Sequence, residues 1–218
     1  VSVSESGIVE PYTLQASKNF VIEKGVVLPR ITYSAAHVVA NPLANVDPWI
    51  NAAVDWDATI NYRRYLWSMG LGVAEAMDTA QRGMGLDWEG AKELIRQSRN
   101  AAKDFPSAIV ASGCGTDHLD VSEGLELDDV IRAYEEQMEF IEGEGGKIIL
   151  MASRALATSA KSPDDYAKVY DRILSQVKEP VIMHWLGDMF DPALRGYWGK
   201  AALNDATDFC LGLIEQNA

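Results

Sequence analysis

Three histidines, His37, His118 and His184, each lie in or just after a short apolar run of the sequence. The imidazole group titrates near neutral pH, so it can serve as an acid, a base or a metal ligand. A single histidine in a strand is also common as a core residue, but three in equivalent places indicate a shared site. We therefore predict that His37 and His184 are catalytic and that His118 binds substrate.

The second apolar run contains Glu75 as its last residue but one and is followed closely by Asp78, Thr79 and Arg82. Strand alternation places Glu75 on the same side as Val73, and a buried carboxylate in an apolar strand needs a partner. That partner could be Arg82, in a purely structural pair, or a metal ion. We predict that Glu75 is catalytic and that Asp78, Thr79 and Arg82 bind substrate.

The third run leads into small residues and then into Asp117 and His118, which form a polar rim and are predicted to bind substrate. Cys114 lies in the same stretch and could act as a nucleophile. No histidine is assured beside it, so inert packing is favoured.

The fourth run is followed by Ser153 and Arg154, and the fifth by Trp185. A guanidinium group suits a carboxylate or phosphate through paired hydrogen bonds, although Arg154 could equally form a surface salt bridge. We predict that Ser153, Arg154 and Trp185 bind substrate. A nearby aromatic cluster could either wall a sugar-like ligand or pack in the core; it consists of Trp185, Phe190, Tyr197 and Trp198.

Five apolar runs position these residues, and each gap between them holds one amphipathic helical segment. Such alternation indicates parallel strands with right-handed crossovers, whose trailing loops meet at one rim. No Gly-x-Gly-x-x-Gly follows the first run, so a barrel is favoured over a dinucleotide-binding sheet. The runs cover residues 31–39, 71–76, 108–112, 147–152 and 180–185.

The helices between the runs carry clear start and stop signals. An apolar stripe at helical spacing covers residues 127–141 and is stopped by glycines. Ser162, Pro163 and Asp165 form a helix start with a capping box, and Asp87 or a neighbour opens another helix. A last helix is predicted over residues 203–216.

We predict an α/β fold in which residues 31–218 form about the first five units of a (β/α)₈ TIM barrel. Eight such units need about 300 residues, so strands six to eight are expected outside this chain. Residues 1–30 are predicted to be a lead-in with a short hairpin through residues 12–14 and 20–22.

The composition of the chain limits the classes of partner that it is expected to bind. The chain has 218 residues, 48% of them hydrophobic, and 19 basic against 32 acidic residues give a net charge of −13. This balance argues against nucleic acid and anionic membranes as partners and favours a small-molecule substrate. Two cysteines in unrelated contexts, short apolar runs and no signal segment predict a cytoplasmic protein.

Four stretches of the chain resemble the dihydrodipicolinate synthase/N-acetylneuraminate lyase superfamily, and more narrowly a bacterial branch of it. They are residues 33–42, 74–85, 148–156 and 183–192, and the likeness covers about residues 30–218. The resemblance implies a class I aldolase or lyase, in which a lysine on strand six forms a Schiff base with a 2-oxo acid. The superfamily's tyrosine after strand four is replaced here by Ser153 and Arg154, and its paired threonines after strand two by Met77, Asp78 and Thr79.

The leading hypothesis is therefore a lyase or aldolase of the dihydrodipicolinate synthase type acting on a small 2-oxo acid or sugar-derived substrate. No cofactor is expected, and a homo-oligomer is predicted. One alternative is a metal-dependent barrel isomerase or aldolase, in which Glu75 and the three histidines bind a divalent ion. Another is a non-catalytic barrel fragment, whose open strand edges would pair with other copies or aggregate.

Overall fold

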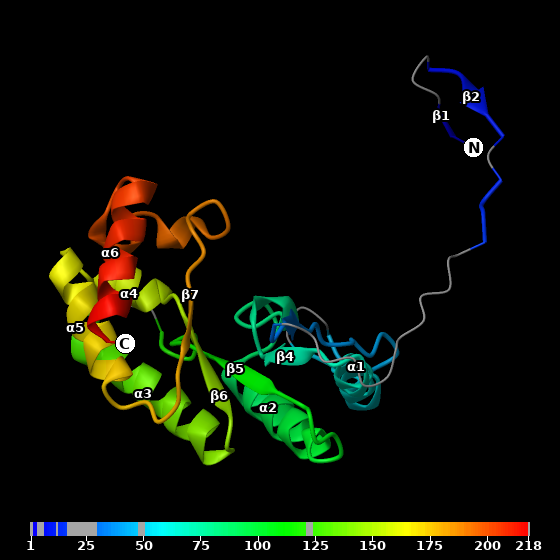
Figure 1. Cartoon of the computed structure of the whole chain (residues 1–218), viewed down its shortest axis with the longest axis horizontal. Coiled ribbons are helices and arrows are strands. Elements are labelled where there is room, and N and C mark those ends of the chain that lie inside the picture. The colour runs from blue at the N-terminus through cyan, green and yellow to red at the C-terminus, as the bar shows by residue number, and fades with distance from the viewer. Residues whose placement is uncertain are drawn as a thin grey trace.

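The structure is a computed structural model that describes residues 2–3, 7–11, 13–16, 30–47, 51–120 and 124–217. Its centre is a sheet of five strands that pair in parallel and in sequence order. The predicted partial (β/α)₈ barrel is confirmed, because the strands run side by side with helices between them (Figure 1). The strands are β3 (Tyr33–Ala35), β4 (Gly72–Glu75), β5 (Val110–Cys114), β6 (Lys147–Met151) and β7 (Ile182–His184).

The helices begin where the sequence predicts. Asp87 caps its helix by accepting a hydrogen bond from the backbone of Gly90, and the capping box of Ser162 and Asp165 is present. The segment between β6 and β7 holds two helices instead of the single one expected, because Ser153 caps a short additional helix. The helices are α1 (Trp56–Ser68), α2 (Trp88–Ala102), α3 (Leu127–Gly143), α4 (Arg154–Ser159), α5 (Pro163–Leu174) and α6 (Leu203–Gln216).

The first strand is shorter than predicted. The expected run of residues 31–39 keeps strand pairing only in β3, which ends at Ala35. The chain then turns to other partners: the backbone N–H of Val39 donates to the Thr59 hydroxyl, and Ala40 bridges Val54. His37 consequently lies beyond the strand instead of within it.

Strand alternation divides the sheet into two faces. Val73 and Val110 pack with the apolar residues of α1 and α2, on the helix-covered side. Ala74, Ala111 and Ile149 pack together on the opposite, inner side of the sheet. Since Glu75 has the same parity as Val73, it belongs to the helix-covered side.

Two short strands, β1 (Ser2–Val3) and β2 (Val9–Glu10), form an antiparallel pair apart from the main sheet (Figure 1). The hairpin predicted through residues 12–14 and 20–22 cannot be compared with it, because residues 12 and 20–22 lie outside the described residues. No helix in the described part of the chain has the length and apolar character needed to cross a membrane.

Candidate active site

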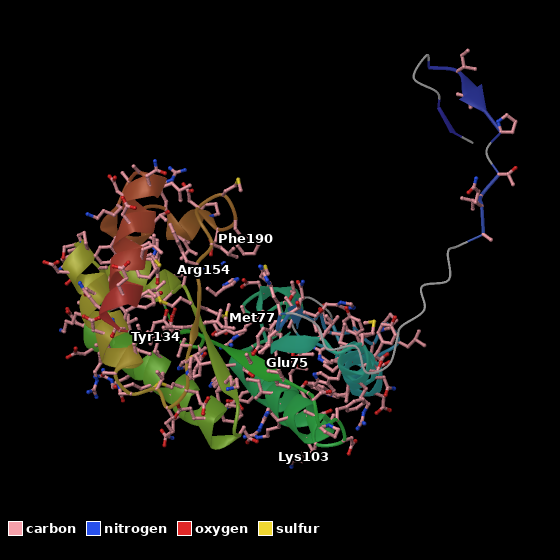
Figure 2. The ribbon with its side chains drawn as sticks, viewed as in Figure 1. Glu75, Met77, Lys103, Tyr134, Arg154 and Phe190 are labelled. Carbon is pink, nitrogen blue, oxygen red and sulfur yellow. The ribbon has the colours of Figure 1, made fainter. Side chains whose placement is uncertain are left out.

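A pocket of about 190 Å³ lies at the carboxyl ends of β4 to β7. In Figure 2, Arg154 and Phe190, two of its lining residues, lie close together beside the segment that follows β7. In parallel α/β sheets this end of the strands is where binding sites form. The polar lining residues include Asp78, Arg82, Thr116, Asp117, Ser153, Arg154, His184 and Asp191.

A backbone kink after β4 directs Asp78 into the pocket. Ala76 is fully buried with a left-handed φ of 52°, and a 3₁₀ turn, η1 (Asp78–Ala80), begins two residues later. The carbonyl of Ala76 passes so close to Gly113 that a Cβ added there would lie 2.7 Å from the carbonyl oxygen. A side chain at position 113 would therefore push the turn that carries Asp78 out of place.

Asp78 and His184 form the titratable centre of the pocket. Burial raises the pKa of the Asp78 carboxyl above its usual value, even though the charges of His184, Arg82 and Arg154 act against the rise. No described residue donates a hydrogen bond to the Asp78 carboxylate or to the His184 ring, so both groups are free to contact a ligand. A carboxyl and an imidazole in one pocket can donate and accept protons in turn.

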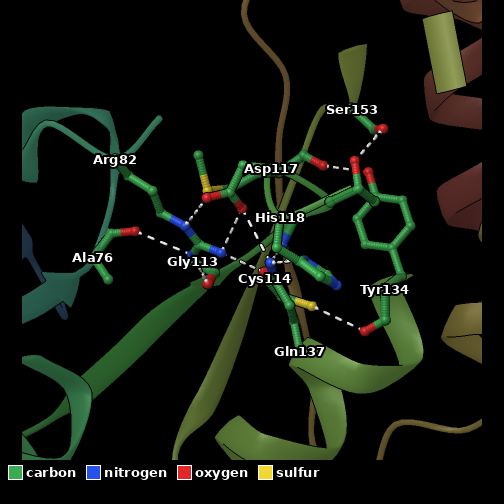
Figure 3. Close-up of polar contacts among 12 residues, drawn as sticks. Ala76, Arg82, Gly113, Cys114, Asp117, His118, Tyr134, Gln137 and Ser153 are labelled. Atoms are coloured by element: carbon green, nitrogen blue, oxygen red, sulfur yellow. Dashed lines mark hydrogen bonds and ion pairs between the residues drawn. The ribbon is translucent and has the colours of Figure 1, made fainter. Parts of the chain in front are cut away.

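Arg82 is held by hydrogen bonds to the surrounding loops and is not free to bind substrate. We call this set of contacts the Arg82 clamp. Its guanidinium donates to both carboxylate oxygens of Asp117 at 2.7 and 3.1 Å, to the carbonyls of Ala76 and Gly113, and to Gln137 (Figure 3). Burial opposes ionisation of Asp117, but the charge and hydrogen bonds of Arg82 outweigh it, and the pKa of Asp117 is lowered. The clamp joins the loops after β4 and β5 to α3.

Replacing Arg82 by methionine is expected to lower the free energy of unfolding at neutral pH by about 2 to 3 kcal/mol, since buried acceptors lose their donor. Asp117 has a lowered folded-state pKa, so its stabilising contribution is present above the unfolded pKa and is lost as pH falls through the folded one. Urea denaturation at neutral pH and at about pH 3 should therefore show the difference shrinking in acid. An equal difference at both pH values would contradict the clamp.

Ser153 is held as part of the pocket floor. Its hydroxyl lies 2.6 Å from that of Thr116 and accepts from the backbone of Leu156, while its own N–H donates to the Tyr197 hydroxyl at 3.0 Å. Tyr197 lies in η3 (Tyr197–Gly199), and its hydroxyl is 3.0 Å from that of Tyr170. The Ser153 hydroxyl is thus a positioned wall group with little hydrogen-bonding capacity to spare.

Arg154 stands at the rim of the pocket, paired with a carboxylate that was not predicted. Its Nε donates to Asp191 at 2.6 Å, and no described residue bonds its two terminal nitrogens. The end of the guanidinium therefore remains available to a ligand. Asp191 precedes Pro192 and caps η2 (Pro192–Leu194). Its signals in the sequence were that helix-start pattern and its place in the resembling stretch of residues 183–192.

Glu75 does not line the pocket, and its partner is Arg63 instead of the candidate Arg82. Its carboxylate is fully buried against α1, where Arg63 donates from Nε and Nη2 at 2.9 and 2.8 Å. The hydroxyl of Ser98 in α2 also contacts it. Figure 2 places Glu75 with β4, away from Arg154. With its oxygens taken up by these donors, Glu75 has the contacts of a structural group.

Four other predicted site residues also lie outside this pocket. His37 is exposed, and its ring is tilted against that of Tyr62, at 4.8 Å between ring centroids. His118 lies between Gln137 and Glu136, at 2.8 and 3.3 Å, in a second depression that shares Gly83 and Asp117 with the pocket. Thr79 is exposed, and Trp185 packs against Trp198. The structure therefore gathers Asp78, Arg82, Asp117, Ser153, Arg154 and His184 and leaves out His37, Glu75, Thr79, His118 and Trp185.

The alternatives left open for Cys114 and the aromatic cluster are also decided. Burial raises the pKa of the Cys114 thiol to about 12, which agrees with inert packing. Tyr197 and Trp198 are buried core residues, whereas Phe190 does line the pocket. The cluster is therefore mainly core, with one aromatic ring exposed to a ligand.

The four residues of the metal hypothesis do not lie together in the structure. Glu75 is held by Arg63, and His37, His118 and His184 lie in three different surroundings. Within the described ranges, no group of three or more His, Cys, Asp or Glu side chains is arranged to hold a metal ion.

Comparison with known proteins identifies the family of this chain. A family model described as "Protein of unknown function (DUF993)" matches residues 3–218. The chain belongs to the DUF993 family. A search of curated proteins gives no match for this DUF993 chain.

Solved structures with the same fold include 4-hydroxy-tetrahydrodipicolinate synthase from Methylacidiphilum fumariolicum SolV, at TM-score 0.55 and 14% identity, with 85% of this chain and 50% of that one covered. Dihydrodipicolinate synthase from Aquifex aeolicus matches at TM-score 0.52 and 11% identity, covering 71% and 44%. The enzyme from Oceanobacillus iheyensis matches at 0.50 and 14%, covering 78% and 51%. The DUF993 chain spans about half the length of these structures, and the likeness confirms the expected fold.

Proposed function

We propose that this DUF993 chain forms part of a lyase of the dihydrodipicolinate synthase type, acting on a small 2-oxo acid or sugar-derived substrate. One observation supports the proposal above others: a pocket at the carboxyl ends of the parallel strands holds a carboxyl and an imidazole that no described residue bonds, and a guanidinium that described residues bond only at Nε. These are the groups that proton transfer beside a bound carboxylate requires.

In this proposal Asp78 and His184 move protons, and Arg154 binds the carboxylate of the substrate through its two terminal nitrogens. The Ser153 and Thr116 hydroxyls and the Phe190 ring shape the wall. Arg82 and Asp117 hold the loops in place and are not assigned a chemical step. His37 and Glu75, expected at first to be catalytic, receive no role in the reaction.

Carbonyl activation in such an enzyme needs an amine, and no lysine is among the described residues that line the pocket. We propose that this chain is part of a longer protein, called the parent protein below. We further propose that the parent protein supplies this lysine from a sixth strand, as the resemblance implies. Borohydride reduction of the parent protein with labelled pyruvate should then attach label covalently. The 218-residue chain alone should stay unlabelled. An unlabelled parent protein, or a labelled 218-residue chain, would reject the proposal in this form.

Replacing Arg154 by methionine in the parent protein is expected to weaken pyruvate binding about 10- to 100-fold, because a charged hydrogen-bond donor to the carboxylate is lost. KM should rise while kcat changes less. The matched control is Arg195→Met, which removes a guanidinium paired with Asp188 outside the pocket. Equal effects of the two substitutions on KM would remove Arg154 from substrate binding.

We also propose that the protein works in the cytoplasm as a homo-oligomer, without nucleic acid or membrane as a partner. Light scattering on the purified parent protein should give at least twice the monomer mass; a monomer would contradict the oligomer.

A further inference from the structure

Six charged or titratable side chains line the pocket, and they include no surplus of positive charge. The carboxylates are Asp78, Asp117 and Asp191, the guanidinium groups are Arg82 and Arg154, and the imidazole is His184. Even with a charged imidazole, the three positive groups only balance the three carboxylates. A substrate carboxylate would therefore leave an uncompensated negative charge in a partly dehydrated space, which is unfavourable unless a proton enters with it.

The hydrogen bonds show which carboxylate is the best acceptor for that proton. Asp117 is held by Arg82 and by the Gln137 amide at 3.0 Å. Asp191 accepts from Arg154 and from the backbone of Ala193. The Asp78 carboxylate receives no hydrogen bond from any described residue, although the residue is half-buried. Its negative charge is therefore the least stabilised of the three.

We propose that the pocket binds a small monocarboxylate together with one proton, which Asp78 takes up while Arg154 binds the ligand. The inference rests on the proposed function, because an anionic substrate is assumed there. The proton comes from solvent and adds to a carboxylate oxygen of Asp78, and no other bond forms or breaks. His184, Arg82, Arg154 and Asp191 are the charged or titratable groups that face Asp78.

This coupling has a chemical consequence for the site. An ionised Asp78 can only accept protons, whereas a protonated Asp78 beside the bound ligand can donate one. Binding of the anion thus converts Asp78 from a base into an acid, while His184 remains the second titratable side chain of the pocket that no described residue bonds.

Propionate is a suitable probe, because it has the carboxylate but no carbonyl that could react with a lysine. Calorimetric titration of the parent protein with propionate, in two buffers of different ionisation enthalpy, counts the protons taken up. We expect an uptake that approaches one proton at alkaline pH. The association constant should fall about tenfold per pH unit there, the limit for one linked proton. Binding with no uptake at any pH would overturn the inference, as would no binding at all.

Asp78→Asn tests the assignment of the proton, since it removes the charge while keeping the shape. This variant should bind propionate more tightly than the wild type at alkaline pH and without proton uptake. The control Asp188→Asn, at a carboxylate outside the pocket, should keep the wild-type uptake. If Asp78→Asn keeps the uptake, Asp78 is not the acceptor. His184→Gln should retain the uptake, which gives a second test should Asp78→Asn not fold.

The proposed function and this inference fail separately. Proton-coupled propionate binding by a parent protein that borohydride and pyruvate do not label would retain the inference and reject the lyase. A parent protein that is labelled but binds propionate without proton uptake would retain the lyase and reject the inference.

Discussion

Replacing Glu75 by glutamine is expected to lower the free energy of unfolding by about 3 to 5 kcal/mol, the usual cost of removing one member of a buried ion pair. Arg63 and Glu75 are both fully buried, and Arg63 would keep its charge with a weaker partner. Ser98 would also lose a charged acceptor. Urea denaturation followed by circular dichroism measures the change.

Glu179→Gln is the matched control, because the same substitution then removes a surface pair with Lys147 at 3.0 Å. That pair is exposed, so the control should change stability by about 0 to 1 kcal/mol. The double variant Arg63→Met, Glu75→Leu should recover only part of the loss, since Arg63 also donates to the carbonyls of His37, Thr59 and Ala36, and these acceptors would lose their donor. A loss below about 1 kcal/mol for Glu75→Gln would show that the pair is not structurally important.

The Glu75 pair also shows where sequence patterns stop being informative. Alternation correctly predicts that Val73 and Glu75 share a side of β4. In a barrel strand both sides are buried, so the pattern does not say which side faces the helices. Arg63 lies in α1, before the strand, and no local spacing links it to Glu75. Arg82, which is nearer to Glu75 along the sequence than Arg63, was therefore the candidate partner.

The strand ends were predictable for a physical reason. Buried parallel strands are short apolar runs, and their loops must meet at one edge. For this reason Asp78, Ser153, Arg154 and His184 could be expected in one place, and the pocket does hold them. Asp191 could not, because it lies in an irregular segment seven residues beyond the end of β7, where no periodicity applies.

His37 was misplaced for a similar reason. Residues 31–39 are apolar enough to continue as a strand, but Val39 contacts Thr59 in α1, and Ala40 bridges Val54 just before that helix. Such a contact between distant segments overrides local strand preference. His37 then lies beyond β3 with its ring near Tyr62, outside the pocket.

Replacing His184 by glutamine is expected to slow proton transfer about 10²- to 10⁴-fold, the usual contribution of a positioned acid or base. Glutamine keeps the polarity of the side chain but cannot take up a proton near neutral pH. The readout is exchange of the methyl protons of pyruvate with deuterated solvent, catalysed by the parent protein and followed by NMR. Because His184 lines the pocket and no described residue bonds its ring, the loss should fall on kcat more than on KM.

His37→Gln is the informative comparison, because the sequence pattern treats the two histidines alike and the structure separates them. His37 is exposed outside the pocket, so its replacement should leave the exchange rate within about twofold of the wild type. The pH profile adds a second criterion: loss of the His184 imidazole should remove one ionisation from the exchange rate, and loss of His37 should not. Equal effects of the two substitutions would mean that the rim of β4 to β7 is not where protons move, and the catalytic assignment of this pocket would fail with it.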